Sequence, residues 1–383
     1  MRPWAILLLA LALGACAAMP TPGPSDRLFA DRLFRAPSEP VDASGVFAVS
    51  AGMKDYLATE IGDIAGGKGR QQTLVNALRN RGQLRLEYDA AFTRNAAEAF
   101  DARTGNCLSL VIMTAAFAKE MGVGVRFQNV YVDENWSRKD DLYFSVGHVN
   151  LTLGKRPPKL GTRLDDGEQL TVDFLPPPDL RGSRWRVIEE KTVLAMYMNN
   201  RAAEALSAGR ADDAYWFARE AIAQDPDFVT AYNTLGVIYH RRGHLEEAAR
   251  SFSHALDREP RNIPVMSNLA PVLASLGRLD ESRAIASRLA RLEPDPPFAF
   301  FDRGKAAMRS GDFRGARDLF ERELDRAPYN HEFHYWLALA LAQLGEPDKA
   351  RRHLALAMEN STTRKDHDIY ASKLARIRSS SVH

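Results

Sequence analysis

The sequence predicts an α+β domain followed by an all-α solenoid of stacked helix pairs. In the second half of the chain, glycines recur every 34 residues, at Gly209, Gly243, Gly277, Gly311 and Gly345. In the first half, an apolar stretch at 108–121 precedes segments in which apolar and polar residues alternate. These two patterns are typical of a buried helix and of β-strands, respectively. At 383 residues the chain is long enough for two or three domains.

The overall composition is that of an ordinary globular protein. Hydrophobic residues make up 45% of the chain and charged residues 26%. The formal net charge of +2 provides no basic surface for a polyanion. We therefore expect no nucleic-acid partner.

Residues 1–16 have the features of an export signal. The apolar run 5–13 follows Arg2 and is much shorter than the roughly 20 residues that span a bilayer. Leu13-Gly14-Ala15-Cys16 resembles a bacterial lipobox, which implies that Cys16 becomes a lipidated N-terminus. Ala17 follows it, without the aspartate that often signals inner-membrane retention. The resemblance thus implies a lipid anchor in the cell envelope, on the periplasmic side of the outer membrane.

Residues 17–45 are rich in proline and small residues, and we interpret them as a tether. They contain the near-duplication DRLFADRLF at 26–34. We expect its apolar side chains, Leu28, Phe29, Leu33 and Phe34, to dock on the domain that follows. Beyond the tether, helices are expected at 53–64, 72–80 and 95–103, with Thr93 as the N-cap of the third.

Cys107 is the one thiol that remains once Cys16 is lipidated, since the chain has two cysteines. Structural cysteines in an oxidising compartment usually pair, so an unpaired thiol there suggests catalysis. Asn106 or Thr104 is expected to cap the helix that begins at Cys107. Unsatisfied N–H groups in a first helical turn favour the thiolate. The alternative is a buried cysteine that acts as a small apolar residue.

Three strands are expected after this helix, at 125–132, 145–153 and 169–175. The alternation places His148, Asn150 and Thr152 on one face of the second strand. Asp173 lies in the third strand, where a neighbouring position brings it beside His148, facing the start of the Cys107 helix. His148 is also the first histidine of the chain. A structural, hydrogen-bonded histidine is the alternative interpretation.

Two connecting segments are expected, of which the first is polar and the second begins with three prolines. The segment 133–141 surrounds Trp136, and it is expected either to line a substrate cleft or to form a solvated hairpin. Residues 176–183 are expected to form the exit turn towards the solenoid.

The segments AAEAFDARTGNCLSL, GHVNLTL and VDF resemble the bacterial transglutaminase-like superfamily, relatives of papain-type thiol enzymes. The resemblance covers residues 46–192 and implies a papain-like core. It implies that Cys107 is the nucleophile, that His148 is the general base and then acid, and that Asp173 orients the imidazole. The family's additional side-chain donor to the oxyanion cannot be assigned in this sequence. A zinc site built from the same three residues is a further alternative, but no local spacing requires it, and we expect no cofactor.

The 34-residue period at 193–364 resembles the tetratricopeptide repeat. Prolines keep the same period at Pro226, Pro260, Pro294 and Pro328. Each of about five units is expected to form two helices, with the central glycine as a left-handed C-cap and the proline ending the second helix. Residues 365–383 are expected to form a capping helix and tail. The resemblance implies a protein or peptide partner in a concave groove; a spacer or an oligomerisation surface is the alternative.

Histidines in the repeats suggest a metal site at first sight. His331 and His334 share a helix face, but no carboxylate or cysteine completes a ligand set at suitable spacing. We expect them to be solvated surface residues.

Two functions follow from these patterns. The first is a membrane-anchored, periplasm-facing thiol enzyme that transfers or hydrolyses an acyl group through Cys107, His148 and Asp173. The second is a non-catalytic envelope scaffold that acts through its repeats.

Overall fold

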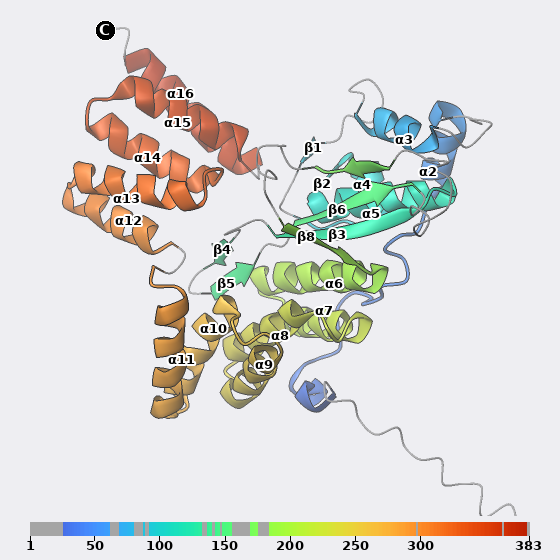
Figure 1. The fold of residues 1–383 in the computed structure, drawn as a ribbon, viewed down its shortest axis with the longest axis horizontal. Coiled ribbons are helices and arrows are strands. Elements are labelled where there is room, and N and C mark those ends of the chain that lie inside the picture. The colour runs from blue at the N-terminus through green and yellow to red at the C-terminus, as the bar shows by residue number, and fades with distance from the viewer. Residues whose placement is uncertain are drawn as a thin grey trace, which may run out of the picture.

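The computed structural model describes residues 26–61, 69–79, 87–88, 92–131, 136–139, 142–145, 148–154, 169–174, 184–295, 298–361 and 364–380. Figure 1 shows an α+β domain that packs against a solenoid of antiparallel helices. The expected leader, the lipobox cysteine Cys16 and the first part of the tether lie outside the described residues. Among the described helices, none combines the length and apolarity that crossing a bilayer requires.

The helical part of the first domain is built around one central helix. Its helices are α2 (Ala51–Tyr56), α3 (Arg70–Arg79), α4 (Ala96–Ala102) and α5 (Cys107–Glu120), and a π-helical turn, η3 (Leu57–Ile61), continues α2. All residues of α5 from Cys107 to Ala118 are buried, as its apolar circumference predicts.

The N-cap predicted for α4 is wrong. Asn95 caps this helix and forms a capping box with Glu98. Thr93 bonds instead to Asn106 and Asn200, two residues that lie outside α4. Because both contacts are long-range, the local pattern around Thr93 does not reveal them.

A four-stranded antiparallel sheet lies beside α5. Its strands are β3 (Val125–Tyr131), β6 (His148–Leu153), β7 (Leu170–Val172) and β8 (Arg184–Ile188), in the order β7-β6-β3-β8. The first three strands lie where the alternation predicts strands. The edge strand β8 was not predicted, because its Trp185 and Val187 are exposed and arginines stand beside them. A short parallel pair, β1 (Glu87–Tyr88) and β2 (Thr104–Gly105), forms a separate two-stranded sheet.

The segment around Trp136 forms a hairpin of β4 (Trp136–Lys139) and β5 (Leu142–Ser145). Strand β5 contacts helix α10 (Ile263–Ser275), so this hairpin bridges the first domain and the solenoid. The expected exit turn at 176–183 lies outside the described residues.

In the part of the chain that the structure describes, the solenoid consists of five helix pairs. They are α6 (Glu190–Ser207) with α7 (Ala211–Gln224), α8 (Val229–Arg241) with α9 (Leu245–Arg258), α10 with α11 (Leu279–Leu292), α12 (Ala299–Ser310) with α13 (Phe313–Arg326), and α14 (His331–Gln343) with α15 (Pro347–Glu359). Helix α16 (Arg364–Ser380) follows the fifth pair. The glycine between the helices of each pair has φ between +74° and +80°, which confirms the left-handed conformation expected of them.

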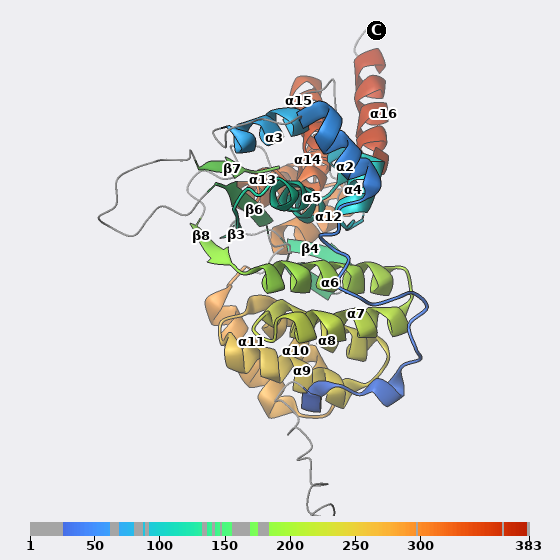
Figure 2. The same cartoon turned by 90° about the vertical axis from the view of Figure 1, so that its right-hand side faces the viewer.

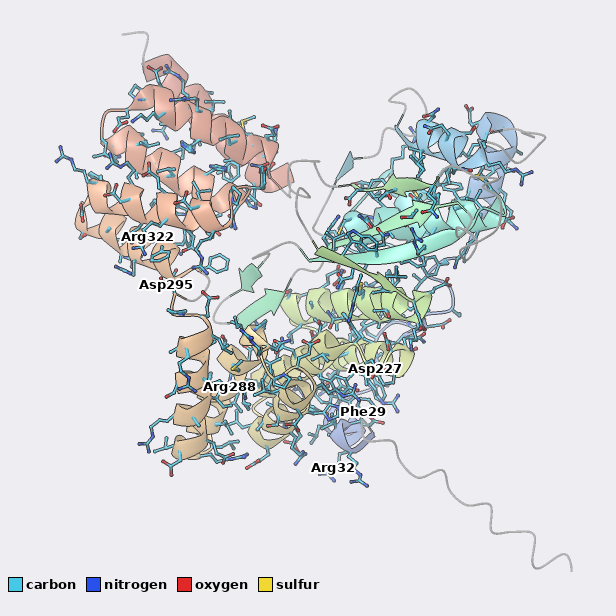
Figure 3. All side chains as sticks on the ribbon, in the orientation of Figure 1. Phe29, Arg32, Asp227, Arg288, Asp295 and Arg322 are labelled. Atoms are coloured by element: carbon cyan, nitrogen blue, oxygen red, sulfur yellow. The ribbon has the colours of Figure 1, made fainter. Side chains whose placement is uncertain are left out.

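The helix pairs form two separate hydrophobic cores. The first core joins the α+β domain to pairs one to three, and the second contains pairs four and five with α16. None of the residues of α11, the last helix before the second core, is buried. An ion pair between Glu293 and Arg326 links the two parts, and beyond it Arg322 lies over the Phe300 ring (Figure 3).

Residues 26–39 form a strap along the edge of the first two helix pairs (Figure 2). It contains two 3₁₀ turns, η1 (Asp26–Leu28) and η2 (Asp31–Leu33). Phe34 packs against Tyr215 of α7 and Tyr239 of α8. The near-duplicated segment therefore docks on the solenoid, and the expectation that it docks on the domain that follows it directly is wrong.

Candidate functional site

Cys107 is the first residue of α5. Asn106 caps this helix, and its side-chain oxygen accepts hydrogen bonds from the Ser109 backbone N–H and hydroxyl. The predicted cap is thus confirmed as Asn106 rather than Thr104. Cys107 is 9% exposed and forms no disulfide. Its position in the first turn places the thiol beside unsatisfied backbone N–H groups, which favour negative charge.

His148 and Asp173 meet at the start of β6. The His148 Nε2 atom lies 2.8 Å from Asp173 Oδ1, and His148 is only 2% exposed. The second carboxylate oxygen of Asp173 accepts a hydrogen bond from the Asn150 side-chain nitrogen at 2.7 Å. Because Asp173 is an acceptor when ionised, this contact assigns the ring proton to Nε2 and leaves Nδ1 for another partner.

The Cys107 thiol lies close to the imidazole of His148. Burial opposes the charged ring, but the hydrogen bond to Asp173 and the proximity of Cys107 outweigh it and raise the pKa of His148 to about 9. Among the described residues, no hydrogen bond of ordinary geometry reaches the buried Nδ1 atom. Cys107 nevertheless contributes to the raised pKa of His148, so its thiol lies near the ring. The structure brings together all three residues that the sequence singled out.

Asn150 is a member of this cluster that the sequence reasoning did not single out as a site residue. The alternation had placed it on the His148 face of the strand, which was the available signal. Strand pairing sets Leu151 opposite Val172, so Asn150 and Asp173 fall on the other face together. Asn150 fixes the second oxygen of Asp173 and thereby orients the carboxylate towards the ring.

A chain of hydrogen bonds connects the start of α5 to the first helix of the solenoid. Asn106 donates from its side-chain nitrogen to the Thr93 hydroxyl at 2.8 Å, and Asn200 of α6 donates to the same oxygen at 3.2 Å. The backbone N–H of Thr93 donates to Glu204 of α6 at 2.7 Å. Burial raises the pKa of Glu204, although the hydrogen bonds from Thr93 oppose that shift. The helix that carries Cys107 is thus positioned partly by the repeats.

The zinc alternative gains no support from the described part of the chain. Within it, no three His, Cys, Asp or Glu side chains are grouped so that they could hold a metal ion. The contacts of the three residues are instead pairwise: Asp173 lies 2.8 Å from the His148 ring, and Cys107 interacts with the same ring.

The histidines of the last repeats are not solvated surface residues, so that expectation is wrong. His334 is 6% exposed, and its Nδ1 lies 3.0 Å from Nδ1 of His353. Its Nε2 lies 2.9 Å from the carbonyl oxygen of Pro328. His331 contacts the Tyr370 hydroxyl of α16 at 2.7 Å. The reason is the stacking of α14 on α15 and α16, which buries a helix face that the sequence pattern leaves polar.

Comparison with known families identifies the repeats. Three profiles described as tetratricopeptide repeat match residues 217–250, 240–299 and 301–363. The C-terminal region therefore contains tetratricopeptide repeats, as the 34-residue period predicts. A transglutaminase-like domain and a lipoprotein signal remain predictions.

Two curated proteins share a limited similarity with the chain. "Protein NPGR2" of Arabidopsis thaliana is 30% identical over 93 residues, which are 24% of this chain and 13% of that protein. The "Hsp70-Hsp90 organizing protein" of Triticum aestivum is 32% identical over 107 residues, which are 28% of this chain and 18% of that protein. The chain thus spans less than a fifth of the length of either relative.

Solved structures of repeat proteins align with part of the chain. TTC0263, a thermophilic TPR protein of Thermus thermophilus, aligns with a TM-score of 0.30 at 20% identity and covers 47% of this chain and 99% of its own. YrrB, a TPR protein with an unusual peptide-binding site, aligns with a TM-score of 0.26 at 22% identity and covers 47% of this chain and 92% of its own.

Proposed function

We propose that this protein is an adaptor that binds a protein or peptide partner through its tetratricopeptide repeats. The observation that carries the proposal is the match of the repeat profiles to 217–363, within the described helix pairs. Stacked helix pairs present an extended surface suited to a helix or an extended peptide. The Triticum aestivum relative is named "Hsp70-Hsp90 organizing protein", and an organising role is the analogous proposal here.

The division into two cores allows a selective test. A deletion of 298–361 together with α16 removes the second core and leaves intact the one that pairs one to three share with the α+β domain. We expect a cell in which this deletion variant replaces the full chain to lose the function that the full chain provides. A cell with the Cys107→Ala variant is expected to keep that function. The reverse outcome, in which the Cys107→Ala variant loses this cellular function and the deletion variant keeps it, would contradict the adaptor proposal.

A second function is favoured by one observation, the 2.8 Å contact between His148 and Asp173 with Cys107 beside the ring. In this proposal the Cys107 sulfur attacks the carbonyl carbon of an amide, and His148 gives a proton to the leaving amine. The resulting acyl-thioester then passes its acyl group to water or to a second amine, whose proton His148 accepts. Asp173 and Asn150 hold the ring in place.

The thiol chemistry has a direct measurement. Alkylation of Cys107 by iodoacetamide at pH 7 is expected to be slower in His148→Ala, because this variant lacks the imidazolium beside the sulfur that would stabilise a thiolate. His367→Ala is the matched control, because His367 is exposed on α16. A p-nitrophenyl ester is expected to leave its acyl group on Cys107, detectable by mass spectrometry. Equal alkylation rates and no acyl adduct would remove this candidate.

The location in the cell is also a proposal. The lipobox resemblance supports lipidation at Cys16 and anchoring to the periplasmic face of the outer membrane, with acyl chains contributing about 0.8 kcal/mol per buried CH₂. Cys16→Ser is expected to release the protein from the membrane fraction. Unchanged fractionation would contradict the anchor.

A further inference from the structure

The strap at 26–39 is bound to the solenoid edge in the way a peptide ligand is bound. Among the strap side chains that the structure describes, Phe34 is the one that is buried, at 8% exposed. Its ring stacks on Tyr215 with centroids 4.0 Å apart and planes 3° from parallel. Tyr239 and His244 flank the ring at 5.7 and 6.2 Å, and the Arg242 guanidinium lies 5.8 Å from its centroid. These four residues place aromatic rings and one guanidinium around the Phe34 side chain.

The same two tyrosines form hydrogen bonds with the strap backbone. The Ala30 N–H lies 3.0 Å from the hydroxyl oxygens of both Tyr215 and Tyr239. The Tyr239 hydroxyl donates to the Leu28 carbonyl at 2.8 Å. Further along the strap, the Trp216 indole donates to the Arg35 carbonyl at 2.6 Å. Backbone hydrogen bonds of this kind favour one conformation of the bound segment, and they depend little on the identity of most of its side chains.

One acidic side chain adds sequence selectivity. The Asp31 carboxylate accepts a hydrogen bond from the Tyr215 hydroxyl and lies 3.3 Å from the Arg219 guanidinium. The Arg219 guanidinium also lies 5.1 Å from the centroid of the Phe29 ring. Arg32, in contrast, lies on the exposed side of the strap (Figure 3). The recognised pattern is therefore an acidic residue three positions before an aromatic one.

The surface that binds the strap belongs to the turns and the edge of the solenoid. Tyr239, Arg242 and His244 lie at the α8–α9 connection, and Tyr215 lies in the first half of α7. The hairpin β4–β5 instead contacts α10. The strap therefore occupies a different surface from the hairpin, and the two internal contacts do not compete.

We propose that this edge is a peptide-binding site for Asp-x-x-Phe segments, and that the strap is its internal ligand. A partner protein that carries a segment of this chemistry competes with the strap for this edge. The strap suits exchange because Phe34 is the one buried side chain among those that the structure describes in it. Its other contacts are hydrogen bonds and ion pairs of part-buried or exposed groups. The proposal rests on the adaptor function and names one of its binding surfaces.

Peptide binding to the full chain tests the proposal. The probe is a fluorescein-labelled peptide of residues 26–40. In the double variant Asp31→Ala, Phe34→Ala, the internal ligand loses its anchor, and we expect the peptide to bind at least tenfold more tightly than to the unmodified chain. Arg32→Ala is the matched control and is expected to behave like the unmodified chain. The same peptide with Phe34→Ala is expected not to bind.

Two outcomes would overturn the proposal. If the double variant keeps its circular dichroism spectrum and thermal transition but does not bind the peptide, the strap is a permanent structural element. Light scattering gives the second such outcome. If the unmodified chain is a dimer and the double variant is a monomer that binds no peptide, the strap of one copy binds to the solenoid edge of the other copy. Neither outcome bears on the deletion of 298–361, so failure of this proposal is distinguishable from failure of the adaptor function.

Discussion

The Nε2 atom of His148 lies 2.8 Å from Oδ1 of Asp173, across the junction of two neighbouring strands. The histidine is buried, and burial alone would favour its neutral form. The carboxylate reverses that preference, together with the nearby thiol of Cys107, so the pKa of His148 rises to about 9. Since the folded state holds the proton more tightly than the unfolded state, this pair stabilises the fold fully below about pH 6.5. The contribution is lost as the pH rises through about 9.

Asp173→Asn is expected to lower the pKa of His148 by about two units. The neutral amide removes the charge that stabilises the imidazolium, while burial continues to oppose protonation. Titration of the His148 ring by NMR measures the change. Asp101→Asn is the control, because Asp101 is exposed on α4 of the same domain. An unchanged His148 titration in Asp173→Asn would show that the carboxylate does not hold the ring in solution.

Thr93→Val is expected to destabilise the protein by about 1–3 kcal/mol, because it leaves the buried Asn106 amide without its acceptor. Denaturant unfolding measures the loss. The same change loosens the cap of α5, so alkylation of Cys107 is expected to change in rate as well. Thr59→Val is the control, since the Thr59 hydroxyl bonds to its own helix at an exposed position. Equal stabilities of the two variants would contradict a structural role for the contact.

The sequence predicts those features of this fold that depend on local or periodic patterns. The 34-residue glycine period predicts the helix pairs because a left-handed C-cap is a local requirement, met in all five at φ between +74° and +80°. The apolar circumference of 108–121 predicts a buried helix. Alternation predicts that His148 and Asn150 share a face, from which the meeting with Asp173 follows.

Local and periodic patterns do not predict long-range contacts. The strap carries apolar residues that predict docking, but only the tertiary structure shows that Tyr215 and Tyr239 receive it. The separation into two cores is likewise hidden, because the proline and glycine period continues unchanged across 293–298. The sequence pattern does not predict strand β8, because Trp185 is a large apolar side chain that is exposed, whereas such side chains are usually buried.

Gly236→Ala is expected to cost about 1–3 kcal/mol of stability. A Cβ at this position would lie 2.5 Å from the Phe252 ring of the partner helix, closer than packed atoms approach. Thermal unfolding measures the loss, and Gly236→Ala combined with Phe252→Leu is expected to recover part of it. Gly45→Ala is the control, because its Cβ would meet no atom within 4 Å. A Gly236→Ala variant as stable as the unmodified chain would mean that α8 and α9 separate at little cost.

Acid is expected to loosen the last repeats through His334 and His353. Burial lowers the pKa of His353 to about 4, and the charges of His334 and Arg352 add to the shift. Because His334 Nε2 donates to the Pro328 carbonyl, its Nδ1 accepts from the Nδ1–H of His353. A proton gained by His353 goes to its Nε2 and puts a charged ring where burial and the neighbouring His334 and Arg352 oppose charge.

The unfolded chain takes up this proton near pH 6.5, so stability is fully present above that pH and declines as the pH falls towards about 4. The loss is expected to be roughly 2 kcal/mol once solvent screening of the half-buried ring is allowed for. Hydrogen exchange of α14 and α15 between about pH 7 and about pH 4.5, corrected for intrinsic rates, measures it. His353→Gln is expected to flatten this pH dependence, whereas His367→Gln on exposed α16 leaves it unchanged. If the protection of α14 and α15 is the same at both pH values, the paired rings do not control the stability of this part of the solenoid.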